Sequence, residues 1–335
     1  MAGCAVILAG LVHCRNSILV EDIPNERSLH TGTARRGGGI AIIMTVAVIA
    51  GWLWVPEPGK WTWQLIIGAS LLGYAVIGLL DDRNLLSISQ RLVAQTIFAG
   101  GLFVTAIQIG WIQPADYFPI FKQTLFLPLW LLLPALGLWL LWMVNLFNFM
   151  DGIDGLAAVQ AVVAAFTLGF WFFASGETFL GLVNFSLAGS VLAFALFNWS
   201  PARVFLGDVG SLSLGAWFGW MSILGAISGK LPFEAFLLLY GLFVFDASYT
   251  LVVRIIRGED WWRGHRNHLY QRLVRAGWSH KKVSAVSLVG CITLATLASL
   301  NVSGAGHPVL WISIGFLGLA VAAGQVRRIE AKIKR

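Results

Sequence analysis

Long apolar runs, separated by short polar segments, cover most of this chain. A lipid hydrocarbon core about 30 Å thick needs about 20 apolar residues per helix. The runs predict eleven spans, at residues 2–20, 38–55, 63–80, 92–112, 124–144, 156–174, 178–199, 209–228, 233–253, 282–300 and 308–326. His13, Cys14 and Arg15 interrupt the first, so it is short for a full span. We therefore expect an all-α polytopic membrane protein with about 10–11 transmembrane helices, forming one domain over residues 1–335.

The composition agrees with a membrane protein. The chain is 58% hydrophobic and only 12% charged, whereas a soluble domain carries about 25% charged residues. The cysteines Cys4, Cys14 and Cys291 have no CxxC spacing and lie in or beside apolar segments. We interpret them as small core residues, with no metal site or disulfide framework. The N-terminal stretch lacks a basic start and a clear small-x-small exit, so we expect no cleavable signal peptide.

Lysine and arginine are divided unequally between the two sides of the predicted spans. Twenty of the 23 fall on one side, and only Lys60, Lys122 and Lys230 fall on the other. The positive-inside rule places the larger group in the cytoplasm, with the N-terminus periplasmic and the C-terminus cytoplasmic. The net charge of +7 is then a signal of topology and anionic-lipid preference, and we expect no nucleic-acid binding. The predicted cytoplasmic loops are about 21–37, 81–91, 145–155, 200–208 and 254–281.

The segment NLFNFMDGIDGL breaks the apolar pattern most sharply. No charged residue occurs from Leu125 to Val144, and then Asn145, Asn148, Asp151 and Asp154 follow at every third position. Such groups are costly in contact with lipid and mark a functional site by default. The alternative is a capped helix end followed by a turn, since Asn, Asp and Gly are common turn residues. Amides with carboxylates are suited to binding a nucleobase edge or a sugar.

Two further predicted cytoplasmic loops carry aspartates. Asp81 and Asp82 are adjacent at the end of an apolar run, and neighbouring carboxylates repel unless a cation neutralises them. Mg²⁺ prefers oxygen ligands and often binds one or two carboxylates together with substrate phosphates. The alternatives for the pair are solvated interfacial charge or an N-cap for the next helix. Asp208 lies between Gly207 and Gly210 and could be either a helix cap or a metal ligand.

The first loop joins arginines to a run of glycines. Arg35 and Arg36 precede Gly37–Gly39 and the start of a predicted helix. Free backbone amides, a helix N-terminus and arginine together can bind an anion. The alternative is a flexible basic loop that obeys the positive-inside rule.

The longest loop contains two histidines three residues apart, His265 and His268, with Arg263 and Arg266 nearby. Zinc would require a further ligand, and no compatible residue is close, so arginine with histidine is better matched to phosphate. A basic amphipathic surface segment is the alternative. We expect a short helix from about residue 267 to 276, ended by Gly277.

Two single positions complete the sequence predictions. Ser279 is expected to be the N-cap of the next span. Asp246 lies inside the ninth predicted span, so we expect it to face the bundle interior and to have a partner there. Its role, structural or catalytic, is open.

In combination these motifs resemble the polyprenyl-phosphate N-acetylhexosamine-1-phosphate transferases, a family that includes the phospho-N-acetylmuramoyl-pentapeptide translocase and the initiating enzymes of O-antigen and enterobacterial common antigen synthesis. The order DD, NxxNxxDGxDGL, FLGDxGSLxLG and HxxH carries the resemblance. It covers nearly the whole chain.

The resemblance implies a role for each motif. It makes Asp81, Asp82, Asp208, His265 and His268 catalytic residues. It assigns Asp208 and Asp82 to Mg²⁺, with Mn²⁺ as an alternative ion. It assigns substrate binding to Arg35, Arg36, Asn145, Asn148, Asp151, Asp154, Arg263 and Arg266. It implies undecaprenyl phosphate as acceptor, a UDP-N-acetylhexosamine as donor, and a homodimer.

Departures from the pattern suggest the branch of the family. The peptidoglycan enzyme carries consecutive histidines where this chain has HRNH, and lysine where it has Leu85. Relatives often have prolines where Thr33 and Arg35 stand. These differences favour the branch that initiates O-antigen-type surface polysaccharide over the muramoyl-pentapeptide enzyme. The expected activity is a Mg²⁺-dependent phosphoglycosyl transfer that releases UMP. The competing hypotheses are a membrane transporter and a lipid-binding scaffold.

Overall fold

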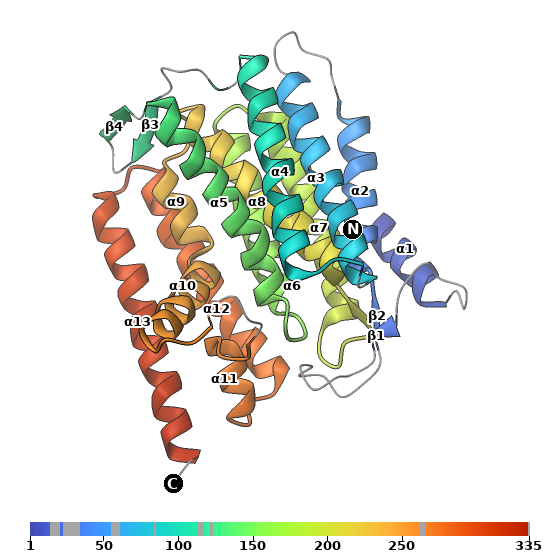
Figure 1. Cartoon of the computed structure of the whole chain (residues 1–335), viewed down its shortest axis with the longest axis vertical. Coiled ribbons are helices and arrows are strands. Elements are labelled where there is room, and N and C mark those ends of the chain that lie inside the picture. The colour runs from blue at the N-terminus through green and yellow to red at the C-terminus, as the bar shows by residue number, and fades with distance from the viewer. Residues whose placement is uncertain are drawn as a thin grey trace.

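The computed structural model describes residues 1–13, 21–22, 34–54, 61–83, 85–110, 112, 117–120, 123–126, 128–260 and 265–333. The helices are α1 (Ala2–His13), α2 (Gly38–Trp52), α3 (Trp61–Asp82), α4 (Ile88–Gln108), α5 (Leu129–Met150), α6 (Leu156–Ala174), α7 (Thr178–Asn198), α8 (Gly207–Ile227), α9 (Phe233–Leu239), α10 (Gly241–Ile256), α11 (Leu269–Arg275), α12 (His280–Val302) and α13 (Pro308–Ile333). The strands are β1 (Glu21–Asp22), β2 (Ala34–Arg36), β3 (Tyr117–Ile120), β4 (Gln123–Phe126) and β5 (Val204–Phe205). Figure 1 shows the long helices packed side by side as one bundle.

Each predicted span corresponds to a helix or to a pair of helices. Within the described residues, eight helices are long and apolar enough to cross a membrane, and a bent pair brings the number to nine. The first two predicted spans are the shortest in the structure: α1 has 12 residues and α2 has 15. The protein is therefore a mostly helical, polytopic membrane protein, as the apolar pattern predicts.

The ninth predicted span, 233–253, is not continuous as the sequence pattern suggested. It divides into α9 and α10, whose axes differ by 81°. Gly241 opens α10, and glycine is a common site of helix kinks. The Tyr240 hydroxyl, at the break, donates to the Phe218 carbonyl of α8 at 3.2 Å. The residues on both sides of the α9–α10 break belong to one apolar run, so the hydrophobic pattern of the sequence could not locate the break.

The fifth predicted span, 124–144, was wrong at both ends. Its first residues belong to β4, which pairs with β3 in an antiparallel hairpin. Pro128, whose backbone is extended, precedes α5. The helix then continues through Asn145 and Asn148 and ends at Asp151. The two asparagines therefore share a helix face, whereas the two aspartates that follow lie in a turn.

Helix α8 lies at the centre of the bundle, and nearly all of its residues are buried. Glycine permits its neighbours to approach closely. A Cβ added to Gly78 of α3 would lie 2.4 Å from the Asp208 carbonyl oxygen, and one added to Gly215 would lie 2.4 Å from the Met143 carbonyl oxygen of α5. The contacts leave almost no internal space between these three helices.

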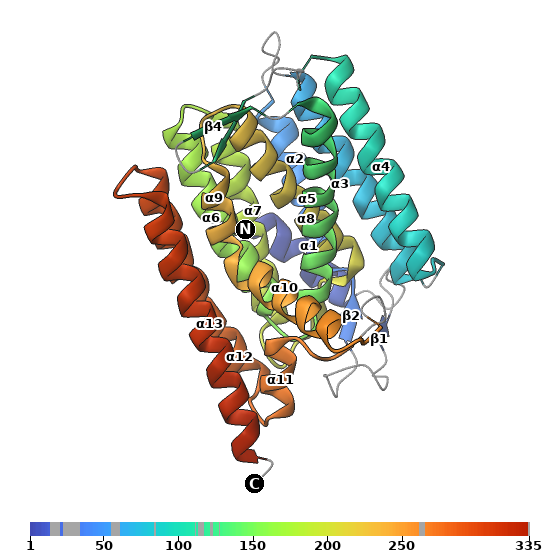
Figure 2. The same cartoon turned by 60° about the vertical axis from the view of Figure 1, so that its left-hand side comes forward.

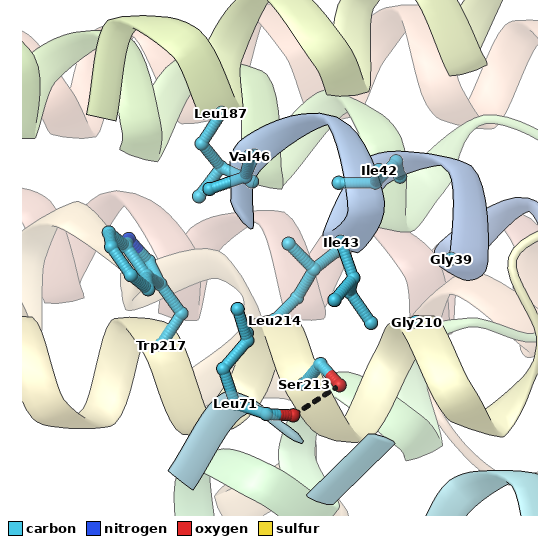
Figure 3. A pocket seen from close by; sticks show the side chains of 10 residues that line it. All are labelled: Gly39, Ile42, Ile43, Val46, Leu71, Leu187, Gly210, Ser213, Leu214 and Trp217. Atoms are coloured by element: carbon cyan, nitrogen blue, oxygen red, sulfur yellow. Dashed lines mark hydrogen bonds between the residues drawn. The ribbon is translucent and has the colours of Figure 1, made fainter. Parts of the chain in front are cut away.

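A gap does remain beside α8, and it is too small to be a binding site. Figure 3 shows it between α2, α3, α7 and α8, where the Ser213 hydroxyl donates to the Leu71 carbonyl at 3.4 Å. Its volume is about 10 Å³ and its lining includes Ile42, Leu187 and Trp217. A cavity needs at least about 10–15 Å³ and polar partners to hold one water molecule. We interpret it as a packing gap.

The aspartates of the predicted site gather at one end of the bundle, hereafter the acidic end. Here α3, α5 and α10 finish, α2 and α8 begin, and the three-stranded sheet β1-β2-β5 lies. It is the lower end of Figure 1, and Figure 2 shows α11 and the C-terminal end of α13 on the same side. The β3-β4 hairpin lies at the opposite end.

We predict that Gly78→Ala destabilises the protein, because the new methyl group meets backbone atoms of α8 that cannot move aside. Overpacking of this kind costs about 1–3 kcal/mol. The matched control is Gly68→Ala on the same helix, where nothing lies within 4 Å of an added Cβ and alanine improves helix propensity. Thermal unfolding in detergent measures both. Equal midpoints for the two variants would contradict the close α3–α8 contact.

Candidate active site

Asp82, the last residue of α3, binds the N-terminus of α8. Its Oδ1 accepts from the Asp208 amide at 3.1 Å and its Oδ2 from the Val209 amide at 3.2 Å. The first amides of a helix have no partner within the helix and carry positive partial charge. Gly207 has φ +75, and an added Cβ there would lie 2.8 Å from the carboxylate. The alternative that the aspartate pair caps the next helix is wrong, because Ser87 and Gln90 cap α4. Asp82 instead binds the free amides of α8 from another part of the chain.

Two arginines supply positive charge beside the aspartate pair. Arg91 Nη1 donates to Asp81 Oδ2 at 2.5 Å, and both side chains are largely buried. Arg36 Nη1 lies 3.7 Å from Asp82 Oδ1. The two carboxylates are therefore held apart in separate ion pairs. Each cation belongs to another segment, Arg36 to β2 and Arg91 to α4, so both ion pairs are tertiary contacts.

Asn148 connects α5 to Asp208. Its Nδ2 donates to Asp208 Oδ1 at 2.6 Å and to the Ser211 hydroxyl at 3.1 Å. Asp208 lies in the first turn of α8, and its side chain makes no cap for that helix. Since Asp82 is the cap, the alternative that Asp208 caps α8 is wrong. The Asp208 carboxylate therefore lies between α5 and the end of α3.

Asn145, one turn deeper, has a different environment. Its Nδ2 donates to Gln95 Oε1 of α4 at 2.8 Å and to the Leu141 carbonyl at 2.8 Å. Asn145 is buried, and Gln95 is completely so. Their remaining polar atoms, Asn145 Oδ1 and Gln95 Nε2, have no partner within the described part of the chain. Gln95 is not among the predicted site residues, although a polar residue inside a predicted span is a signal in itself.

The glycine-rich segment after Arg36 makes backbone contacts with the strand before α8. The Gly37 amide donates to the Phe205 carbonyl at 3.2 Å, and the Gly39 amide to the Leu206 carbonyl at 2.9 Å. Arg35 pairs in register with Val204. The amides of Gly37 and Gly39 therefore have backbone partners and are not available to bind an anion. The glycines here permit close packing, and the binding roles of Arg35 and Arg36 stay predictions.

The pKa of Asp151, the C-cap residue of α5, is affected by the other acidic side chains. Burial raises the pKa of the Asp151 carboxyl well above its ordinary value, and the negative charges of Asp208 and Asp82 raise it further. Arg36 lowers the pKa of this carboxyl but does not offset those effects. The acidic end therefore has more carboxyl groups than its arginines pair with, and Asp151 keeps its proton more readily than an ordinary aspartate does. This is the environment in which a cation or a cationic ligand group is favoured.

Asp154 is a structural connection between three segments. Its Oδ1 lies 3.4 Å from His280 Nδ1, its Oδ2 accepts from the Ala202 amide at 3.2 Å, and its carbonyl accepts from the Ser284 hydroxyl at 2.7 Å. Burial raises the pKa of the Asp154 carboxyl, but the hydrogen bond and charge of His280, together with hydrogen bonds from Ser200 and the Ala202 amide, lower the pKa overall. Only 7% of the residue is exposed. Since α5 ends before Asp151, Asp151 and Asp154 do not lie on one helix face.

The histidine loop begins the short helix α11, close to the predicted position, and Gly277 follows it with φ +85. The Ser279 hydroxyl accepts from the Lys282 amide, which confirms the predicted N-cap. Asp246 is buried in α10 and has the interior partner that was expected, His268. The rings of His265 and His268 lie 4.8 Å apart.

Tyr270 joins the histidine loop to the end of α5. Its hydroxyl donates to the Phe149 carbonyl at 2.9 Å. An added Cβ on Gly152 would lie 2.1 Å from that hydroxyl oxygen, so a glycine is required there. The Phe149 ring stacks near His268 with 6.3 Å between centroids. Tyr270 was missed because a lone tyrosine beside a basic segment carries no sequence signal for this contact.

The structure thus brings together most of the predicted residues at the acidic end. Asp81, Asp82 and Asp208 meet with Asn148 and Asp151, and Tyr270 brings the histidine loop to the same helix end. Asn145 and Asp154 lie at its margins, in their own contacts. Arg263 lies outside the described residues. Arg266 is described and has interactions within the protein. Catalytic and binding roles for all of these residues remain predictions.

The oxygen ligands at the acidic end suit a divalent cation. Carboxylate oxygens of Asp81, Asp82 and Asp208 are hard ligands of the kind Mg²⁺ prefers. Within the described ranges, no three acidic, histidine or cysteine side chains form a ready-made metal site. Both Asp82 oxygens already accept amides, which leaves Asp208 and Asp81 the less committed carboxylates. The set therefore fits an ion that takes one or two protein ligands and completes its shell with phosphate and water.

Comparison with known proteins identifies relatives across most of the chain. The glycosyl transferase family 4 model matches residues 63–226. The chain is 27% identical to a probable undecaprenyl-phosphate N-acetylglucosaminyl 1-phosphate transferase of Bacillus subtilis, over 91% of this chain and 82% of that protein. It is 31% identical to a phospho-N-acetylmuramoyl-pentapeptide-transferase of Lactobacillus helveticus, over 84% of this chain and 88% of that one. A protein of that name from Desulforudis audaxviator is 29% identical, over 85% and 89%.

We predict that Asp154→Asn destabilises the protein at pH 7. A carboxyl whose folded pKa lies below its unfolded pKa stabilises the folded state above the unfolded pKa, and this stabilisation is lost as the pH falls through the folded pKa. We expect a loss of about 1–3 kcal/mol at pH 7 that shrinks below about pH 4, near the ordinary Asp pKa. Thermal midpoints of the variant and the wild type, measured at both pH values, test this. A difference that does not change with pH would refute the ionic role.

Proposed function

Since this chain belongs to glycosyl transferase family 4, we propose that it transfers an N-acetylhexosamine 1-phosphate from a UDP-sugar to undecaprenyl phosphate and releases UMP. The names of its relatives supply the lipid acceptor and the class of sugar. We place the enzyme in the bacterial inner membrane with the acidic end in the cytoplasm, because most of its lysines and arginines belong to that side of the predicted spans. Nucleotide-sugars and the lipid headgroup can meet there.

One observation carries this proposal: four carboxyl groups and two guanidinium groups meet at the acidic end of the bundle. They are Asp81, Asp82, Asp151 and Asp208, with Arg36 and Arg91. Phosphoryl transfer depends mostly on positioning and on neutralising charge. A rigid set of opposite charges, held by helix ends, is suited to that task. The position of these charges at one end of the bundle also allows a lipid substrate and a soluble substrate to meet at a membrane face.

The reaction is balanced without any additional reactant. An oxygen of undecaprenyl phosphate attacks the β-phosphorus of the UDP-sugar and forms a new P–O bond. The bond from that phosphorus to the bridging oxygen breaks, and UMP leaves with that oxygen. Asp81, held by Arg91, orients the acceptor phosphate and takes any remaining proton. Little base strength is needed, because a phosphate monoester has a second pKa of about 6.

The remaining residues have one of two roles: some would bind the metal ion, and the others contact the donor. Asp208 would hold Mg²⁺, or Mn²⁺, together with an oxygen of Asp81 or Asp82. The ion, when bound, neutralises charge on the pyrophosphate as UMP departs. Asp82 holds Asp208 in place through the amides of α8, and Asn148 orients its carboxylate. Asp151 and the histidine loop with Arg266 contact the nucleotide-sugar.

Within this class we favour the branch that initiates O-antigen and related lipopolysaccharide or surface polysaccharide synthesis, with UDP-GlcNAc as the first donor to test. The HRNH motif and Leu85 depart from the pattern of the muramoyl-pentapeptide enzymes. Muramoyl-pentapeptide transfer, as in peptidoglycan synthesis, is the second candidate, because several relatives carry that name. We also propose a homodimer.

A transporter is the candidate from another class, and the broken α9–α10 pair is the observation that favours it, since discontinuous helices line transport sites. A transport site would place ionisable groups near mid-membrane. Asp246 instead contacts α11 at the acidic end. Solute uptake into proteoliposomes without UMP release would favour the transporter.

We expect the purified protein to release UMP from UDP-GlcNAc only with undecaprenyl phosphate and Mg²⁺ together. Chelation with EDTA abolishes the release and added Mg²⁺ restores it. We predict that Asp208→Asn loses at least about 100-fold in kcat, because removal of one preorganised charged group costs about 10²–10³-fold. Glu177→Gln, a carboxylate at the other end of α6 that pairs with Lys230, is the matched control and keeps its activity. Unchanged turnover in Asp208→Asn would refute the metal assignment.

A donor panel distinguishes the branches. We expect UDP-GlcNAc or a related UDP-N-acetylhexosamine to yield a lipid-linked product with undecaprenyl phosphate, and UDP-MurNAc-pentapeptide to yield at least about tenfold less. Mass detection of the lipid product measures both. A preference for the pentapeptide donor would show that the HRNH motif does not exclude muramoyl substrates.

A further inference from the structure

Asp246 is a buried ionisable residue of the ninth predicted span, and the proposed mechanism does not use it. Only 5% of it is exposed. Its Oδ1 accepts from the Leu269 amide at 2.8 Å and from the Thr250 hydroxyl at 3.2 Å, and its Oδ2 accepts from the Tyr270 amide at 3.2 Å. The carboxylate thus binds the first amides of α11. These partners offset the cost of burying the charge, which would otherwise be large.

The same carboxylate contacts the ring of His268. His268 Nδ1 lies 3.3 Å from Asp246 Oδ1, and both side chains are buried. An ionised carboxylate can only accept a hydrogen bond, so this contact requires the proton on Nδ1. Nε2, on the far side of the ring from Asp246, then carries the lone pair or the second proton. A histidine's tautomer is set in this way by the partner of its other nitrogen.

The surroundings of His268 fix its ring plane as well. The ring is nearly parallel to Tyr270, with centroids 5.9 Å apart and planes 15° apart, and it stacks near Phe149 of α5. Phe149 directly follows Asn148, which binds Asp208. The imidazole is therefore held between the cap of α11 and the helix end that carries the acidic site. Three elements, α5, α10 and α11, meet at this ring.

We infer that Asp246 is a positioning residue for His268. It holds the imidazole with the proton on Nδ1, so that Nε2 is the nitrogen presented to the phosphates or sugar of the donor. This pairing gives the acidic residue of α10 a role. It also explains why α11 begins directly after His268. The functional half of this inference, that Nε2 faces the donor, rests on the proposed function. The tautomer half, that Nδ1 carries the proton, does not.

A purely structural role for Asp246 would give different results. In that case the carboxylate would cap α11 and the ring would be incidental. The chain offers a control for capping alone: Gln271 Oε1 accepts from the His268 amide at 3.3 Å. Gln271→Leu weakens the same helix start without removing the acceptor for Nδ1. Asp246→Leu removes the acceptor, while Asp246→Asn keeps an amide oxygen where three donors converge.

Solid-state NMR of ¹⁵N-histidine-labelled protein in lipid bilayers decides the tautomer, with no substrate present. The chain has six histidines, and His268→Gln identifies the signal of interest. At pH 8, we expect Nδ1 of His268 to be protonated in the wild type, in Gln271→Leu and in Asp246→Asn. In Asp246→Leu we expect that signal to be lost or shared with Nε2. A wild-type ring protonated only at Nε2, or an unchanged Asp246→Leu spectrum, would overturn the inference.

Steady-state kinetics then test the functional half. We expect Asp246→Leu to lose about 10–100-fold in kcat, the usual effect of losing the carboxylate behind a functional histidine in metal sites, with a small change in KM. The same substitution in a His268→Gln background should cost less than about threefold more, and Gln271→Leu should stay near wild type. Additive losses, or an equal loss in Gln271→Leu, would reduce Asp246 to a helix cap. If the wild type itself releases no UMP, the proposed function fails while the NMR result stands.

Discussion

The candidate site depends on one kind of interaction, a buried carboxylate that binds the first amides of a helix from another part of the chain. Asp82 of α3 binds α8 in this way, and Asp246 of α10 binds α11. A helix N-terminus provides unpaired amides and positive partial charge, so it stabilises the anion and is fixed by it. Each contact places a functional candidate, Asp208 in one case and His268 in the other, at a defined position.

Packing makes the first of these contacts possible. The central helix α8 can begin beside the end of α3 only because glycine lets the two backbones approach, at Gly78 and at Gly207. The short parallel pairing of β2 with β5 brings Arg36 to the same point. Charge balance follows from this geometry: Arg36 and Arg91 each neutralise one member of the Asp81–Asp82 pair. The excess of negative charge that remains is what a divalent ion would offset.

The contacts also separate residues that the sequence presents as equivalent. Asn145 and Asn148 share a helix face, yet only Asn148 contacts the acidic site, while Asn145 pairs with Gln95. Asp151 and Asp154 follow the same three-residue spacing, yet their carboxyl groups differ. Burial and neighbouring acids raise the pKa of Asp151, whereas the hydrogen bonds and the His280 charge around Asp154 lower its pKa overall. Their different environments follow from where α5 ends.

The sequence by itself determined the class of protein, the approximate position of each span and the side on which the acidic motifs gather, because lipid requires long apolar helices and tolerates few charges. It also predicted the short helix after His268, its glycine stop and the Ser279 cap, since these are local signals. It did not predict the break before α10, the strand that replaces the start of the fifth span, or which carboxylate caps which helix. Those features depend on contacts between residues far apart in the chain, such as Asp82 with Val209, and only the tertiary structure decided them.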